Sequence, residues 1–200
     1  NDHESKLNHD KNIDTAMAGL RNANQRAATI ISTLRNMFGN GRKSNSEFDL
    51  NELVNDVVLL CRSTLQKQSI HIRMDLSSQP LTITGDKSQL QQVLLNLITN
   101  ASEAFTQDFK GSKHIKIHTE LNLDQTRLTV SDNGCGISPE IQAVVFDLLR
   151  TNKDTGMGIG LWLSKTIVDS HNGTISFETA PNTGTTFTVD LPITTTSMYY

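Results

Sequence analysis

The chain has 200 residues, of which 36% are hydrophobic and 20% charged, so it can bury a core and wholesale disorder is excluded. Its formal net charge of -3 gives no reason to expect a nucleic acid as partner, and no apolar run reaches the ~18 residues of a membrane span. Cys61 and Cys135 have neither zinc nor disulfide spacing, which fits a reducing compartment. We therefore expect a cytoplasmic chain without membrane contact, which is compatible with a longer, membrane-anchored parent protein.

The first helix is predicted between Ile13 and Phe38. Seam positions recur there in steps of three and four, which is the heptad pattern of a helix packed along other helices. They are Ile13, Met17, Leu20, Asn24, Ala27, Ile31, Leu34 and Phe38. The alternative is a helix that lies on the core of its own domain. Gly39 and Gly41 end the helix, and residues 39–46 are a polar linker.

The second part of the chain, residues 47–193, mixes helices and strands without strict alternation. Helices are predicted at 49–67, 87–105 and 159–170, a helix or loop at 138–150, and strands at 70–76, 81–84, 113–122, 126–132, 173–180 and 184–191. Asp49 is expected to cap the first of these helices. This order is typical of an α+β fold, a two-layer sandwich with helices on one face of a mixed, mostly antiparallel sheet.

The helix predicted at 87–105 carries the first of three segments suited to chemistry. Its buried stripe is predicted to be Leu90, Val93, Leu94, Leu97, Ala101, Ala104 and Phe105. Asn96 and Asn100 are four residues apart, so they project one above the other beside this stripe. A carboxamide oxygen suits Mg²⁺, which takes few protein ligands and fills its shell with phosphate oxygens and water. Taken alone, two solvated asparagines on a polar face are the simpler interpretation.

The second segment runs from Val130 to Ile137, where a strand ends in Asp132 and two glycines follow at Gly134 and Gly136. An ionised carboxylate accepts hydrogen bonds and can bind an exocyclic amine such as that of adenine. Glycines allow the backbone to approach a flat ring closely. The alternative is an ordinary strand-to-helix turn, because Asp-Asn-Gly is common turn sequence.

In the third segment, Gly156, Gly158 and Gly160 lead into the helix at 159–170, and Lys153 precedes them. Backbone amides freed by glycines, with a helix N-terminus behind them, form a phosphate site. A flexible loop before a helix is the alternative. A dinucleotide-binding site is disfavoured, because no strand leads directly into these glycines.

In this order the three segments resemble the nucleotide-binding boxes of the superfamily of histidine kinases, gyrases, heat-shock chaperones and mismatch-repair ATPases, over residues 47–193. Sensor histidine kinases of two-component systems are the most similar branch. Residues 24–38 resemble the second helix of their dimerisation hairpin, and residues 86–93 resemble the lead-in to their asparagine box. Residues 171–173 and 184–187 match their closing segments.

The resemblance implies a Bergerat-type ATP-binding fold preceded by a long coiled-coil-like helix. Residues 1–46 would be a partial dimerisation hairpin (turn, second helix and linker), residues 47–193 the catalytic ATP-binding domain, and residues 194–200 a flexible tail. It implies ATP and Mg²⁺ as cofactors, with Asn100 as the metal ligand. The nucleotide-binding residues that it implies are Asn96, Asn100, Asp132, Gly134, Gly136, Ile137, Lys153, Gly156, Met157, Gly158, Ile159, Gly160, Leu161 and Thr185.

Individual roles are implied in the same way. Asp132 would bind the adenine amine, with Thr185 in support and Gly134 and Gly136 shaping the pocket. Ile137 and Leu161 would form apolar walls, Asn96 would lie against the phosphates, and Lys153 would contact them below a lid that Gly156, Gly158 and Gly160 allow to close.

The asparagine at position 96 distinguishes a kinase from an ATPase. ATPase branches of the superfamily typically carry a glutamate there that activates water, whereas a carboxamide cannot act as a general base. This favours transfer of the γ-phosphoryl group to a histidine, with relay to a response-regulator aspartate. His3 and His9 lie too close to Ile13 for a whole acceptor helix, so we expect the chain to be a fragment without its phosphorylated histidine or any other certain catalytic residue.

The expected partners are the protein's own dimerisation and acceptor helix and a response-regulator receiver domain, with a homodimer in the full-length protein. Residues 148–150 depart from the aromatic pattern of the family, and Glu103 replaces a basic residue. The first departure motivates one alternative, a nucleotide-binding regulatory module without phosphotransfer, and the other alternative is an ATPase of the same superfamily. His114 and His118 share a predicted strand face, but surface histidines are a better interpretation than a two-ligand metal site.

Overall fold

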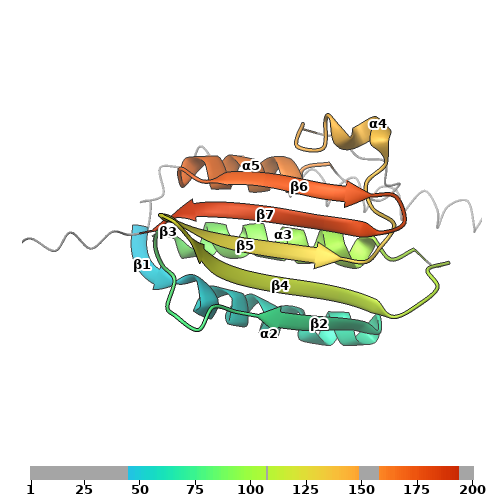
Figure 1. Cartoon of the computed structure of the whole chain (residues 1–200), viewed down its shortest axis with the longest axis horizontal. Coiled ribbons are helices and arrows are strands. Elements are labelled where there is room, and N and C mark those ends of the chain that lie inside the picture. The colour runs from blue at the N-terminus through green and yellow to red at the C-terminus, as the bar shows by residue number, and fades with distance from the viewer. Residues whose placement is uncertain (1–44, 107, 149–157, 194–200) are drawn as a thin grey trace, which may run out of the picture. The chain divides into compact units, whose positions relative to one another are not determined.

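The structure is a computed structural model that describes residues 45–106, 108–148 and 158–193 (Figure 1). These residues all belong to one of the two compact units of the chain, the one that covers Lys43–Tyr200. None of the helices in the described ranges is long and apolar enough to cross a membrane. The helix expected at residues 13–38, the tail expected at 194–200 and the site residues Lys153, Gly156 and Met157 lie outside the described residues.

A five-stranded sheet forms one layer of the described unit. Its strands are β2 (Ile70–Asp75), β4 (Lys113–Asn122), β5 (Gln125–Asp132), β6 (Thr174–Ala180) and β7 (Gly184–Pro192). Their order is β2-β4-β5-β7-β6, and only the β2–β4 pair is parallel. The prediction of a mixed, mostly antiparallel sheet is therefore confirmed.

Helices form the second layer. α2 (Leu50–Lys67), α3 (Lys87–Glu103) and α5 (Gly160–Ser170) lie behind the sheet in Figure 1, on one of its faces. Within the described part of the predicted helix or loop at 138–150, which ends at residue 148, there is one short helix, α4 (Pro139–Gln142). Between the two layers lies the core, whose most buried side chains include Leu53, Leu94, Leu97, Ile115 and Ile117.

The two long helices begin at aspartates, as the sequence predicts for α2. Asp49 accepts a hydrogen bond from the amide of Asn51 (2.9 Å), and Asp86 accepts from the amides of Ser88 and Gln89 (3.0 and 3.2 Å). Such N-caps satisfy amides that lack a partner inside the helix. They fix where α2 and α3 start, and thus which side chains of α3 face the sheet.

His171 connects the beginning of α3 to the end of α5. Its Nε2 accepts a hydrogen bond from the amide of Asp86 (3.0 Å), while its Nδ1 lies 2.8 Å from the carbonyl oxygen of Ile167. A carbonyl oxygen can only accept, so Nδ1 carries the proton and the ring is the neutral Nδ1–H tautomer. The two helices are thus joined at the end opposite to the site described below.

A short strand at the start of the described unit was not predicted. β1 (Asn45–Asp49) pairs antiparallel with β3 (Thr82–Asp86), in register from Asn45↔Asp86 to Asp49↔Thr82. It begins inside the residues that we interpreted as linker, before residue 47. Three of its five residues are exposed, so it lacks the apolar alternation that reveals a strand in a sequence.

Candidate functional site

Hydrogen bonds from Asn96 join the first and third sequence segments. Asn96, half-buried on α3, donates from Nδ2 to the carbonyl oxygen of Gly160 (3.2 Å) and lies 3.4 Å from Oγ of Ser164. Ser164 is fully buried and donates to the same carbonyl (2.9 Å). The beginning of α5 therefore lies against the middle of α3, one turn before Asn100, which is also half-buried.

The loop after β5 joins the second segment to the end of the same helix. The amide of Cys135 donates to the carbonyl oxygen of Ala104, the residue that follows α3 (3.0 Å). Gly134 is buried, and a Cβ atom there would lie 2.6 Å from Cβ of Ala104 and 2.7 Å from its carbonyl oxygen. Glycine is required at this position because the two backbones approach closely.

The other side of this loop rests on the β6–β7 hairpin. Gly136 has φ +75°, a left-handed conformation that favours glycine, and the backbone of Ala180 leaves no room for a Cβ atom. The amide of Ile137 donates to Oγ1 of Thr179 on β6 (2.9 Å), and the amide of Asn182 donates to the carbonyl oxygen of Cys135 (2.9 Å). The loop is thus held between α3 and the hairpin.

Asp132 and Thr185 face the helical layer. Along β5, Leu128 and Val130 are buried against the helices, and alternation places Asp132 on the same face. Its Oδ1 accepts a hydrogen bond from the amide of Gly134 (2.8 Å). Thr185 follows the same rule on β7, where Phe187 is buried, and it is itself only 5% exposed. These polar groups lie at one end of a mostly apolar layer, close to the end of α3.

Apart from Ile137, which lies in the loop after β5, the remaining described site residues lie at the start of α5. Gly158 has φ +64°, Ile159 is 3% exposed as the residue before the helix, and Gly160 and Leu161 open it. Ile137 and Leu161 are partly buried and pack against the core. Within the described residues, the predicted site residues thus line one end of the domain; their roles stay predictions.

Three residues that no sequence motif indicates also support this site. Asn133 accepts from the amide of His114 (2.7 Å) and donates to the carbonyl oxygen of Ser112 (2.9 Å), so it attaches the loop to the start of β4. Thr179 and Ser164 hold the loop and α5 as described. Asn133 and Thr179 have partners far away or on a neighbouring strand, so no spacing in the sequence indicates them, whereas the bond from Ser164 to Gly160 lies within α5.

Phe146 follows α4 and contacts Phe177 of β6 edge to face, with ring centroids 5.8 Å apart. Phe177 in turn contacts the more deeply buried Phe187 of β7, with ring centroids 6.0 Å apart. This aromatic row attaches the segment after α4 to the sheet, although that segment has fewer aromatic residues than its family pattern.

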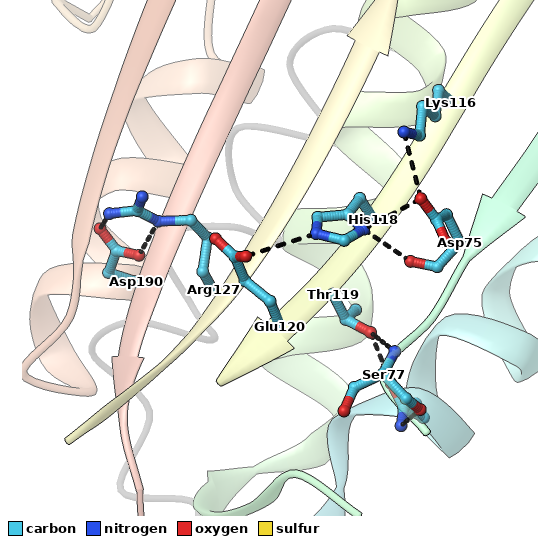
Figure 2. A network of polar contacts seen from close by, with 9 residues as sticks. Asp75, Ser77, Lys116, His118, Thr119, Glu120, Arg127 and Asp190 are labelled. Carbon is cyan, nitrogen blue, oxygen red and sulfur yellow. Dashed lines mark hydrogen bonds and ion pairs between the residues drawn. The ribbon is translucent and has the colours of Figure 1, made fainter. Parts of the chain in front are cut away.

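The outer face of the sheet carries charged side chains that pair with one another (Figure 2). His118 lies between Asp75 (3.4 Å) and Glu120 (3.6 Å), and Lys116 bonds Asp75 (3.2 Å) and holds the pKa of that carboxyl below its usual value. In the described ranges no three or more His, Cys, Asp or Glu side chains are arranged to hold a metal ion. On this outer face Lys116 pairs with Asp75 and Arg127 pairs with Asp190, and His118 lies between Asp75 and Glu120.

This α+β sandwich, with glycine-rich loops at the end of a central helix, is the architecture of a nucleotide-binding domain of the histidine kinase type. Residues 85–195 match the family model described as Histidine kinase-, DNA gyrase B-, and HSP90-like ATPase. The match covers more than half of the chain, which therefore belongs to this family.

Individual relatives agree with this assignment. The C4-dicarboxylate transport sensor protein DctB of Rhizobium meliloti (strain 1021) is 34% identical over 175 residues, covering 88% of this chain and 28% of the relative. The solved catalytic domain of histidine kinase ThkA is 31% identical with a TM-score of 0.67, covering 75% of this chain and 96% of that domain. A structure of ThkA in complex with response regulator protein TrrA matches with 25% identity and a TM-score of 0.64, covering 86% of this chain and 49% of that one. The chain spans about a quarter to a third of the length of the curated relatives.

Proposed function

We propose that this chain is the ATP-binding catalytic part of a sensor histidine kinase. It transfers the γ-phosphoryl group of ATP to a histidine on an acceptor helix, from which the group passes to an aspartate of a response regulator. The observation that carries the proposal is the hydrogen bond from Asn96 to the carbonyl of Gly160, together with the attachment of the Asp132 loop to the end of α3. Helix α3 thus holds two proposed binding groups in place, the carboxylate of Asp132 for the base and the N-terminus of α5 for the phosphates.

Adenine binds at the sheet end of the site. The carboxylate of Asp132 accepts a hydrogen bond from the adenine amine, and Thr185 supports it from the neighbouring strand. Because Gly134 and Gly136 have no side chains, a flat ring can lie close to the backbone of this loop. Ile137 and Leu161, which pack on the core, offer apolar contacts to the ring faces.

The triphosphate binds at the start of α5. The amide of Leu163 bonds the carbonyl of Ile159 (2.8 Å), so the amides before it lack an acceptor inside the helix and can bind phosphate oxygens. Mg²⁺ fits this arrangement, since Asn100 offers a hard carboxamide oxygen one turn beyond Asn96 and the ion needs few protein ligands. When bound, Mg²⁺ neutralises charge on the phosphates. Lys153, outside the described residues, is proposed to add a positive charge.

Asn96 acts as a support rather than as a base. Its Nδ2 already donates a hydrogen bond to the carbonyl oxygen of Gly160. In addition, a carboxamide cannot take a proton from water at neutral pH. Bound ATP therefore keeps its γ-phosphoryl group until a histidine nitrogen reaches it. This reasoning disfavours the ATPase alternative.

One experiment separates the candidate functions. The chain is joined to an upstream acceptor helix and given labelled ATP and Mg²⁺. Acid-labile phosphate on the protein supports the kinase, free phosphate supports the ATPase, and tight binding with neither product supports the regulatory module. A matched Asp132→Asn variant, which keeps the shape but loses the carboxylate, should lose the labelling. If the wild-type chain shows no Mg²⁺-dependent ATP binding in calorimetry, the proposal fails.

The partners follow from the same proposal. A response-regulator receiver domain is supported by the similarity to ThkA, whose complex with a response regulator has been solved. Residues 1–46 are proposed to supply one helix of a dimerisation hairpin, with the catalytic domain at 47–193 and the tail at 194–200. The full-length protein would then be a homodimer, as a hairpin needs a partner to complete a bundle.

A further inference from the structure

Three polar side chains form a row across neighbouring strands at the site. Thr179 of β6 is paired in register with Thr185 of β7. On the other side of β7, the pairing Ser131↔Thr186 places Asp132 of β5 next to Thr185. All three lie on the face that covers the core, because Val130, Phe187 and the partly buried Phe177, each two positions away along its strand, share that face. These three side chains lie at the end of the core where the adenine is proposed to bind.

The hydrogen bonds of Thr179 determine which way its neighbour's hydroxyl points. Oγ1 of Thr179 lies 3.0 Å from the carbonyl oxygen of Gly184, which can only accept, so Thr179 donates its single hydroxyl hydrogen there. The same oxygen accepts from the amide of Ile137 (2.9 Å). Oγ1 of Thr185 is 3.1 Å away, and because Thr179 has no second hydrogen, Thr185 must be the donor.

The hydroxyl of Thr185 therefore has no hydrogen left for a ligand and presents only lone pairs. An ionised Asp132 next to it is also an acceptor only. A row of acceptors suits a purine whose 6-position is an amine, as in adenine. It opposes a 6-oxo group at the same position, because that oxygen is also an acceptor and neither side then supplies a hydrogen there, while the N1–H of such a purine lies at the neighbouring ring position.

We propose that Thr179 is a specificity-determining positioning residue that selects 6-amino over 6-oxo purines by consuming the hydroxyl hydrogen of Thr185. Thr179 acts through Thr185 and does not itself contact the base. The inference rests on the proposed function, since it assumes that the site binds an adenine nucleotide. It adds the residue that makes Thr185 an acceptor, which neither Asp132 nor the glycines explain.

The test compares ATP with inosine triphosphate, which differs at the 6-position, by calorimetry with Mg²⁺ on folded protein. In Thr179→Val the hydroxyl of Thr185 loses its acceptor and is free to donate to a ligand. We therefore expect the ratio of the affinity for ATP to the affinity for inosine triphosphate to fall by about 3- to 10-fold, which is the effect of one hydrogen bond. Thr179→Ser keeps the hydroxyl and should keep the ratio. Thr188→Val, a matched change on the opposite face of β7, should leave the ratio unaltered.

A second variant covers the case in which Thr179→Val does not fold. Thr185→Val removes the acceptor but leaves the bonds from Thr179 to Ile137 and Gly184, and the ratio should fall by a similar factor. An unchanged ratio in a folded Thr179→Val or Thr185→Val protein would overturn the inference while ATP binding itself stands. Failure of the wild-type chain to bind ATP would instead remove the proposed function on which it rests.

Discussion

Replacing Gly134 with alanine should both destabilise the domain and weaken nucleotide binding. The new Cβ atom would lie 2.6 Å from Cβ of Ala104 and 2.7 Å from its carbonyl oxygen. Neither neighbour is the end of a flexible side chain, so the loop or the end of α3 must move. Movement also stretches the bond from the amide of Cys135 to the same carbonyl, which is 3.0 Å in the structure.

The magnitude follows from these two contacts. Overpacking a close contact costs about 1–3 kcal/mol, and losing one backbone hydrogen bond costs about 1 kcal/mol. The free energy of unfolding should therefore fall by about 2–4 kcal/mol for Gly134→Ala, which corresponds to a lower Tm by roughly 10 °C. Denaturant unfolding gives the free energy, and calorimetry with Mg²⁺ and ATP gives the binding.

Gly160 supplies the matched control. A Cβ atom there would lie 3.8 Å from Cγ of Asn96, an ordinary contact, and alanine is favoured over glycine within a helix. Gly160→Ala should therefore leave the free energy of unfolding unchanged or slightly raised. If Gly134→Ala were as stable as the wild type, the close approach between the loop and α3 could not be what fixes the site.

Three further changes test other parts of the structure. Asn96→Asp loses the donor to Gly160 and places a carboxylate beside a carbonyl oxygen, so unfolding should cost about 1–3 kcal/mol less and ATP should bind more weakly in calorimetry. The pKa of Asp75 is lowered mainly by Lys116, so its stabilising effect is complete above pH ~4 and is lost as the pH falls through the lower folded pKa. Asp75→Asn should therefore flatten that part of a plot of stability against pH, and an unchanged slope would refute this assignment. His171→Ala should lower the free energy of unfolding by about 1–3 kcal/mol in denaturant unfolding, because it removes the hydrogen bond that joins the start of α3 to the end of α5, with little change in ATP affinity.

The helices that carry the site were predictable because their pattern is local. The apolar stripe of α3 repeats with the helical period, and Leu90, Leu94 and Leu97 are buried as expected. Ile98 is also buried, at 1% exposure, although the predicted stripe omitted it, because helices on one face of the sheet also bury their flanks against each other. Phe105, which the prediction included, is half-buried because α3 ends at Glu103.

The supporting contacts of the site could not be predicted in the same way. Asn133 and Thr179 act through partners that strand register brings beside them, and register depends on pairing across the whole sheet. The sequence motifs yield a prediction of the site residues that stays a prediction, whereas the direction of the Thr185 hydroxyl follows only from the atoms around it. Strand β1 was missed for a related reason, since its pairing with β3 is carried by backbone groups rather than by side-chain type.

The attachment of the Asp132 loop to both α3 and the β6–β7 hairpin has a consequence for measurements of affinity. These bonds join parts of the folded chain to one another, so the ordering of the loop is completed during folding rather than on binding. Adenosine, AMP, ADP and ATP should then share one nearly constant contribution from the base. Differences in affinity along this series would then measure the contribution of the phosphates alone. The series would therefore measure how strongly the start of α5 binds phosphate.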